Sequence, residues 1–232
     1  MMSDLALMEL QIAALFCHDA AGRILTTNEP DPTRAPRLFV GRTSAGNLWR
    51  FREDLPSDLV RELEALLARE PVATDLRQPL VSFAALHEAL SAHAPVVSTW
   101  QGPAWRFPDA IARPPDVIAI RPPERELVRE HYPFLASQLE HLQPCLAVVR
   151  DGTAVSVCFS SRNTVAAAEA GVDTVEAFRG RGYATAVTAV WALAVRESGR
   201  IPLYSTDWDN LASQRVARRL GLVLYGADCS II

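Results

Sequence analysis

A short glycine-containing stretch constrains this chain more than any other feature of its sequence. The stretch VEAFRGRGYAT, residues 175–185, follows an apolar run and precedes a long alanine-rich helical pattern. Glycines at a strand-to-helix junction let the backbone come close to a ligand. The first amides of a helix have no intrahelical acceptor, and the positive end of the helix dipole lies beside them. The stretch is therefore either an anion site suited to a pyrophosphate or a tight arginine-rich turn.

Two common nucleotide-binding loops fit this stretch poorly. A dinucleotide fingerprint needs a third glycine where Thr185 stands, and an acidic residue at the end of the next strand, where only Asp207 is near. A triphosphate-binding loop needs a lysine, but all 23 basic residues of the chain are arginine. The absence of lysine also excludes Schiff-base catalysis.

Composition narrows the remaining classes of protein. The chain has 232 residues, 49% of them hydrophobic, and a formal net charge of −4, which is typical of a globular protein and disfavours nucleic-acid binding. The four cysteines and five histidines are scattered without metal-ligand spacing. The apolar N-terminus carries Asp4 and Glu9 in place of the basic region of a signal peptide, and no run is long enough for a membrane span. We therefore expect a cytoplasmic protein with no metal, nucleic-acid or membrane partner.

A proline- and aromatic-rich segment, residues 98–116, divides the chain. Proline removes a backbone donor, so we expect neither a long helix nor a central strand there, and we place a domain boundary at its end. Residues 1–113 are predicted to form a smaller α+β domain and residues 116–232 a second domain. In the first domain we expect helices at 5–17, 57–68 and 83–93 and strands at 23–26, 37–41 and 48–51. In the second we expect helices at 123–129, 135–142, 184–197 and 211–220 and strands at 117–120, 145–149, 154–160, 166–174, 201–205 and 222–225.

Two motifs in the second domain resemble one known family. The stretch Arg179-Gly-Arg-Gly182-Tyr-Ala184 looks like the acyl-CoA-binding motif of the GNAT superfamily of N-acyltransferases, in which Gln or Arg is followed by a Gly and then by a Gly or Ala. About 30 residues further on, Asn210-Leu-Ala-Ser213, continuing to Gly221-Leu222, resembles the second motif of that family. The resemblance covers residues 116–232. It implies an α/β (α+β) fold in which helices flank a mixed sheet with splayed central strands, after an additional N-terminal domain.

The resemblance also implies a cofactor, acetyl-CoA, and residues that hold it. In the family the loop amides hold the pyrophosphate, the strand end before the loop pairs with the pantetheine arm, and the asparagine of the second motif bonds that arm. Carried over to this sequence, the cofactor-binding residues are Asp173, Thr174, Val175, Arg179, Gly180, Arg181, Gly182, Tyr183, Ala184, Thr185, Asn210 and Ser213.

The reaction that the resemblance implies is direct attack of a neutral amine on the thioester. Family bases often lie on the strand at 166–174, where alternation places Glu169, Gly171 and Asp173 on one face. Glu169 is the first candidate base and Asp173 the second. Many family members protonate the leaving thiolate with a tyrosine seven residues after the motif asparagine, but this chain has Ala217 there. Ser213, Tyr204 or water could substitute.

A second departure from the family is the short C-terminal tail, which leaves little room for the usual final strand. The function that the resemblance implies is N-acetyl transfer from acetyl-CoA to a primary amine of a small molecule or peptide, in a ternary complex. Two alternatives stay open: a CoA-binding sensor or scaffold without turnover, and transfer of a longer acyl chain. The N-terminal domain would shape acceptor recognition, and a homodimer is an option for the assembly.

Overall fold

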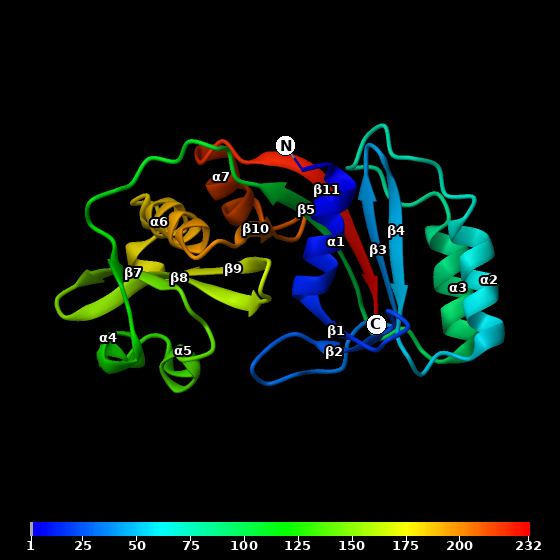
Figure 1. Ribbon diagram of the computed structural model, residues 1–232, viewed down its shortest axis with the longest axis horizontal. Helices are drawn as coiled ribbons and strands as arrows, with labels where there is room; N and C mark the ends of the chain where they lie inside the picture. Colours follow the sequence, from blue (N-terminus) through cyan, green and yellow to red (C-terminus); the bar gives the residue numbers. More distant parts are fainter. Residues whose placement is uncertain (1) are drawn as a thin grey trace.

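The computed structural model describes residues 2–232, and one nine-stranded sheet runs through most of their length (Figure 1). The strand order is β4-β3-β11-β5-β10-β9-β8-β7-β6, and a separate two-stranded ribbon, β1-β2, lies beside it. All neighbouring pairs in the large sheet are antiparallel except β9 with β10, which are parallel. The strands are β1 Phe16–His18, β2 Ile24–Thr27, β3 Leu38–Thr43, β4 Gly46–Phe51, β5 Thr99–Arg106, β6 Ile118–Ala119, β7 Cys145–Arg150, β8 Thr153–Asn163, β9 Ala167–Thr174, β10 Ile201–Ser205 and β11 Val223–Ile231.

Helices cover both faces of this sheet (Figure 1). Helix α6 lies against β7 to β10, and α1 lies on the opposite face against β9, β3 and β11. Helices α4 and α5 share the face of α1, over β7 and β8, whereas α2 and α3 pack on the other face of β3 and β11. The helices are α1 Asp4–Leu15, α2 Ser57–Leu67, α3 Phe83–His93, α4 Glu126–Arg129, α5 Pro133–Gln138, α6 Tyr183–Glu197 and α7 Leu211–Arg219, with short 3-10 turns at Pro122–Glu124 and Glu176–Phe178.

Local patterns explain why α6 forms where it does. Val187, Trp191 and Val195 recur every four residues and are buried together against the sheet, which is the stripe of an amphipathic helix. Gly199 ends the helix with a φ of 78°, a left-handed conformation that glycine adopts without strain. The mixed sheet flanked by helices confirms the predicted α/β fold class.

The segment at residues 98–116 contradicts the expectation that it cannot hold a central strand. Its first part is β5, which lies between β10 and β11 and pairs with both. Pro103 is tolerated because its carbonyl faces Thr206, just beyond the last residue of β10. In an antiparallel ladder the N–H and C=O of one residue point to the same side. The position where Pro103 lacks a donor therefore also faces the chain beyond the end of β10. No hydrogen bond to β10 is lost.

Strand β5 also explains the short C-terminal tail. Strand β11 runs from Val223 almost to the end of the chain, further than the predicted 222–225, and has β5 on one side and β3 on the other. A segment from before the predicted boundary thus lies beside the last strand. The division into residues 1–113 and 116–232 stays a prediction, but strands from both parts share one sheet.

Other differences from the predicted elements are small. Residues 16 and 17 were predicted to end the first helix, but they begin β1, because Phe16 and Cys17 pair with Thr27 and Thr26. The helix predicted at 123–129 is a 3-10 turn followed by the one-turn helix α4.

Candidate functional site

A slot opens between two central strands of the sheet. Strands β9 and β10 pair in parallel only from Ile201 to Leu203, opposite Ala167 to Glu169. Beyond Leu203 and Glu169 the ladder stops, so a ligand can lie between the strand ends without breaking a backbone bond. The apex of this slot, defined here as Glu169, Ala170, Leu203, Tyr204 and Ser205, is where the two strands part.

The glycine loop lies at the mouth of the slot and presents unused amides. Gly180 and Gly182 have φ angles of 78° and 83°, a region in which other residues are strained. Helix α6 has no side-chain cap, and its first backbone bond runs from the Ala186 amide to the Gly182 carbonyl. Within residues 2–232, none of the backbone amides from Gly180 to Thr185 donates a hydrogen bond to a backbone or side-chain acceptor. The loop is therefore an anion site in which amides and the helix dipole act together.

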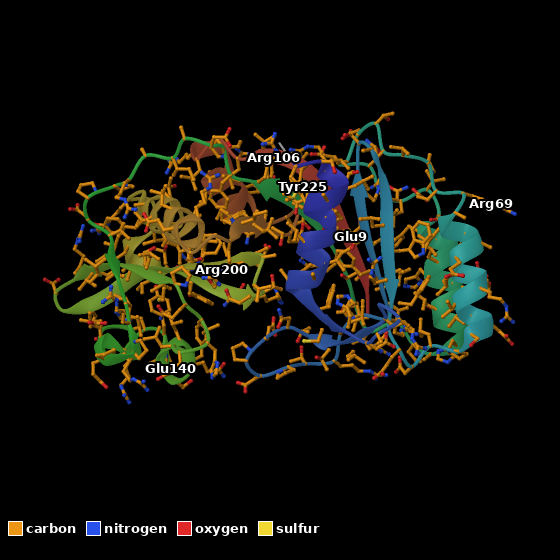
Figure 2. The ribbon with its side chains drawn as sticks, viewed as in Figure 1. Glu9, Arg69, Arg106, Glu140, Arg200 and Tyr225 are labelled. Atoms are coloured by element: carbon orange, nitrogen blue, oxygen red, sulfur yellow. The ribbon has the colours of Figure 1, made fainter. Side chains whose placement is uncertain are left out.

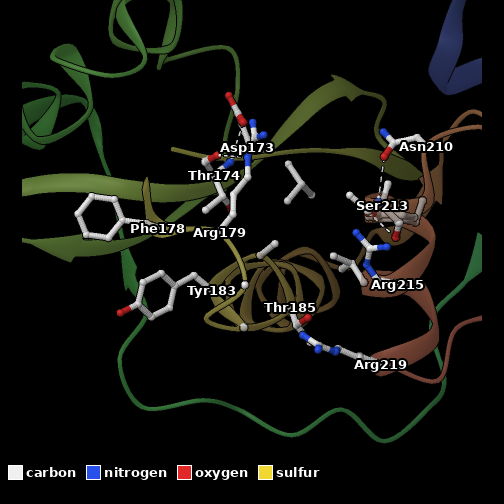
Figure 3. Close-up of a pocket in the computed structure, with 17 residues that line it drawn as sticks. Asp173, Thr174, Phe178, Arg179, Tyr183, Thr185, Asn210, Ser213, Arg215 and Arg219 are labelled. Atoms are coloured by element: carbon white, nitrogen blue, oxygen red, sulfur yellow. Dashed lines mark hydrogen bonds between the residues drawn. The ribbon is translucent and has the colours of Figure 1, made fainter. Parts of the chain in front are cut away.

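Loop and slot share one cavity of about 460 Å³ (Figure 3). It runs from the loop and the start of α6 across to the start of α7. Most of the residues predicted to bind the cofactor line it: Asp173, Thr174, Arg179, Gly180, Gly182, Tyr183, Ala184, Thr185, Asn210 and Ser213.

Three of the predicted site residues do not line this cavity. The Val175 amide donates to the Val155 carbonyl, and its side chain packs against the core under α4 and α5. The Arg181 guanidinium donates to the Ala177 carbonyl and lies over the Phe178 ring, 5.1 Å from its centroid. Glu169 lies on the α1 face of the sheet. The roles predicted for these three residues stay predictions.

Two arginines of α7 line the cavity, although the sequence analysis did not predict them as site residues. Arg215 and Arg219 are four residues apart, so they lie on one face of the helix. In Figure 3 both side chains extend from α7 toward α6, with Arg219 beside Thr185. The spacing was visible in the sequence, but which face of α7 meets the glycine loop depends on the tertiary fold. Val172, Phe178, Tyr204, Ala212 and Val216 complete the lining.

Asn210 begins α7. Its Oδ1 accepts the Ser213 amide at 3.0 Å, so it is the N-cap of the helix. Its side chain also lines the cavity, which leaves the Nδ2 amide as a donor for a ligand.

On the α1 face of the apex, Glu169 bonds across the slot. Ser205 donates to its Oε1 at 2.7 Å, and the Oε2 atom has no partner within the described residues. The side chain is 2% exposed. Burial raises the pKa of this carboxyl above its usual value, although the Ser205 hydrogen bond and the charge of Arg162 oppose that shift. A buried carboxyl with a raised pKa and a free oxygen can accept a proton.

On the opposite face of the apex, two hydroxyl groups form a pair. The Tyr204 and Ser213 oxygens lie 2.6 Å apart, and both residues line the cavity. In such a pair one hydroxyl donates to the other, which leaves one proton for a ligand. Burial raises the pKa of Tyr204, so its hydroxyl stays protonated at neutral pH. Ala217, one helical turn beyond Ser213, is fully buried in the same core as Tyr204.

Comparison with known proteins identifies part of the chain. Residues 145–227 match the family model described as GNAT acetyltransferase. These residues form a GNAT acetyltransferase domain. They include the slot strands, the glycine loop and α7, whereas α1 and β5 lie outside the matched residues.

Two solved structures, from Streptococcus suis and Drosophila, have the same fold. A GCN5-related N-acetyltransferase-like protein from Streptococcus suis is 19% identical over 87% of this chain and 86% of that chain, with a TM-score of 0.51. A Drosophila protein is 14% identical over 89% of this chain and 78% of that chain, with a TM-score of 0.50. A putative GNAT-family acetyltransferase from Novosphingobium aromaticivorans is 18% identical over 59% of this chain and 65% of that chain, just under two thirds of its length, with a TM-score of 0.48. No curated protein matches the sequence.

None of the helices within residues 2–232 is both long and apolar enough to cross a membrane. In the same part of the chain, no three His, Cys, Asp or Glu side chains come together as a metal site would require.

Proposed function

We propose that the protein transfers an acetyl group from acetyl-CoA to a primary amine by direct attack in a ternary complex. The observation that carries this proposal is the run of unbonded amides from Gly180 to Thr185, which borders the same cavity as the slot. A pyrophosphate fits such amides, and the slot gives the pantetheine arm a path from the loop toward the apex. The GNAT domain supports acyl transfer as the type of reaction.

Three groups of residues would hold the cofactor in this proposal. The loop from Arg179 to Thr185 would take the pyrophosphate through its backbone. The strand end at Asp173 and Thr174 and the helix start at Asn210 and Ser213 would flank the pantetheine arm. Arg215 and Arg219 add positive charge on the other wall of the cavity, where phosphate groups can pair with guanidinium groups.

The chain's own residues can assist each proton movement. An alkylamine has a pKa of about 10, so it arrives mostly as an ammonium ion and must lose a proton before attack. Glu169 is the base we favour, since its free oxygen and raised pKa suit it to accept that proton. Asp173, at the exposed end of the same strand, is the second candidate. The amine nitrogen then bonds to the carbonyl carbon as the C–S bond breaks, and the electron pair of the C–S bond goes to sulfur. The new amide nitrogen loses its second proton to water or to the departing thiolate.

The departing sulfur needs modest help. A thiol has a pKa of about 8.5, so a thiolate is already a tolerable leaving group. The Tyr204–Ser213 pair can donate a hydrogen bond to it, and water in the cavity can supply the thiol proton afterwards. Ser213 is therefore a candidate catalytic residue despite Ala217.

One alternative has specific support. Ala217 stands where many members of the family have the tyrosine that protonates the leaving thiolate. The lack of that acid favours a CoA-binding sensor or scaffold without turnover. A longer acyl group remains a variant of the same transfer reaction.

Calorimetric titration with acetyl-CoA, followed by a thiol-release assay over a panel of primary amines, tests the proposal. We expect saturable binding and release of free CoA with at least one amine. Binding without thiol release from any amine would favour the sensor. No binding of acetyl-CoA at millimolar concentration would contradict both. Stronger competition by a longer acyl-CoA would identify the other variant.

A further inference from the structure

A second cavity continues from the cofactor cavity at the start of α6. Its volume is about 320 Å³. Gly182, Thr185 and Arg219 line both cavities. The two cavities therefore meet beside the free amides of the glycine loop. A ligand bound at those amides can extend in two directions, into the slot and into the second cavity.

One wall of the second cavity belongs to the segment between β5 and β6, residues 107–117, called the connector here. It begins directly after Arg106, which Figure 2 labels at the end of β5. In Figure 3 the green connector runs past α6 and Arg219, with which it shares the second cavity. The lining residues that the connector and α6 supply are small or apolar: Ala110, Ile111, Ala112, Pro114, Ala186 and Ala189. Such walls suit a flat, largely apolar ring.

Helix α6 holds the connector in place. The Arg196 guanidinium donates at 2.8 to 3.2 Å to three successive carbonyl oxygens, those of Phe107, Pro108 and Asp109. Arg113 pairs with Glu197, the next residue of α6. Ile111 packs against the core between α6 and the sheet. The wall of the second cavity is thus fixed to the same helix whose first turn borders the glycine loop.

The charge at the second cavity is positive. Among its lining residues that the structure describes, Arg219 alone is charged, and no carboxylate within residues 2–232 pairs with it. The acidic residues of the connector, Asp109 and Asp116, do not line the cavity, and Asp116 faces Arg150. A free guanidinium beside apolar walls suits a phosphate group attached to a ring system.

We propose that the second cavity binds the adenosine 3′-phosphate end of acetyl-CoA, and that the connector thereby selects CoA thioesters over thioesters carried on phosphopantetheine alone. The inference rests on the proposed function and names the thioester class of the same site. With the pyrophosphate at the loop amides and the pantetheine arm in the slot, the nucleoside is the part of the molecule left for the second cavity. The adenine ring lies between the connector and α6, and the 3′-phosphate meets Arg219.

This selection belongs to the connector of this chain rather than to the matched domain, because the connector lies outside residues 145–227. A phosphopantetheine thioester offers a phosphate to the loop and an arm to the slot, but it leaves the second cavity without an occupant. It therefore loses both the burial of the adenine ring and the charge-assisted hydrogen bond to Arg219. The two kinds of thioester should differ in affinity for that reason.

Calorimetric titration of the full chain with three thioesters tests this inference. They are acetyl-CoA, acetyl-dephospho-CoA, which lacks the 3′-phosphate, and S-acetyl-4′-phosphopantetheine, which lacks the nucleotide. We expect acetyl-dephospho-CoA to bind about tenfold more weakly than acetyl-CoA, because it cannot bond Arg219 through that phosphate. We expect S-acetyl-4′-phosphopantetheine to bind at least about a hundredfold more weakly, because the ring is also missing.

Two arginine variants assign the phosphate contact. Arg219→Ala should bring the affinities for acetyl-CoA and acetyl-dephospho-CoA within about twofold of each other, because the group that distinguishes them is gone. Arg218→Ala is the matched control, since Arg218 shares the last turn of α7 but lines neither cavity. It should keep the difference between the two thioesters that wild type shows.

A second pair of variants tests the connector itself. Ala112→Glu places a negative charge in the wall of the second cavity. Ala119→Glu is its matched control, at an exposed alanine of β6 that lines neither cavity. We expect Ala112→Glu to weaken acetyl-CoA binding at least about fivefold, because like charges repel, and to leave the affinity for S-acetyl-4′-phosphopantetheine unchanged. Ala119→Glu should change neither affinity.

Three results would separate this inference from the proposed function. Equal affinity of wild type for acetyl-CoA and S-acetyl-4′-phosphopantetheine would overturn the inference. Equal effects of Ala112→Glu and Ala119→Glu on acetyl-CoA binding would overturn it as well. Binding of none of the three thioesters would instead contradict the proposed function.

Discussion

At the scale of single residues, the glycine loop shows how one backbone conformation can serve a ligand. An added Cβ at Gly182 meets no protein atom within 4 Å, so crowding by the protein does not require a glycine there. The positive φ angle requires it, and that angle sets the direction of the amides that follow.

Gly182→Ala should therefore cost about 1–2 kcal/mol of folding free energy through strain and also weaken acetyl-CoA binding. Gly199→Ala is the matched control, because Gly199 has a φ of 78° and equally open surroundings at the other end of α6. We expect similar losses of stability by urea denaturation, but a weaker acetyl-CoA affinity by calorimetry only for Gly182→Ala. Equal affinity in the two variants would remove the loop from the binding site.

Asp228 should make stability depend on pH. Its pKa in the folded protein is raised by burial, so the folded state holds a proton that the unfolded state releases above about pH 4. Wild type then loses stability as pH rises toward the folded pKa, by up to about 1.4 kcal/mol per pH unit. Asp228→Asn lacks this loss, so its stability relative to wild type should grow as pH rises above about pH 4 in denaturant titrations. A constant difference would show that Asp228 is ionised throughout.

At the scale of elements, α7 adds a charged wall that the two sequence motifs did not predict. A second cavity of about 320 Å³ shares Gly182, Thr185 and Arg219 with the first. Its other side is formed by residues of the segment between β5 and β6: Ala110, Ile111, Ala112 and Pro114. Arg219 thus borders both cavities, whereas Arg218 lines neither.

Arg219→Ala should weaken acetyl-CoA binding about tenfold, because a charge-assisted hydrogen bond contributes about 1.5–3 kcal/mol. The affinity for acetyl-CoA should also fall less steeply as ionic strength rises, because one fewer positive charge lies near the phosphates. Arg218→Ala removes the same charge from the same helix and should leave the affinity within about twofold of wild type. Equal effects of the two variants in calorimetric titrations at two salt concentrations would assign the effect to net charge alone.

Sequence patterns predicted those elements whose signals are local. The alternation that places Ala168, Ala170 and Val172 opposite Glu169 is a property of one strand, and it agrees with the structure. The central position of β5 was not predictable from Pro103, because the tolerance of that proline depends on where β10 ends. The Gln11–Asp228 bond joins residues 217 positions apart, and no local pattern links them.

At the scale of the whole molecule, the N-terminal part completes the sheet of the GNAT domain. Strand β11 has both of its neighbours, β5 and β3, before residue 107. Removal of residues 1–113 would therefore expose both edges of β11 and the apolar face that α1 covers.

We expect a fragment of residues 116–232 to aggregate or to lack a cooperative melting transition, and the full chain to unfold in one transition. Circular dichroism and calorimetry on the two proteins would measure this. A fragment that melts as cooperatively as the full chain would show that the sequence boundary marks an independent domain.

The central claim is that the free amides of the glycine loop hold the acetyl-CoA pyrophosphate while the thioester lies in the slot. Amide chemical shifts from nuclear magnetic resonance, recorded as acetyl-CoA is added, test it directly. We predict the largest downfield shifts at the amides from Gly180 to Thr185, with smaller changes at Tyr204 and Ser213. Saturable binding that leaves those loop amides unshifted would contradict the account.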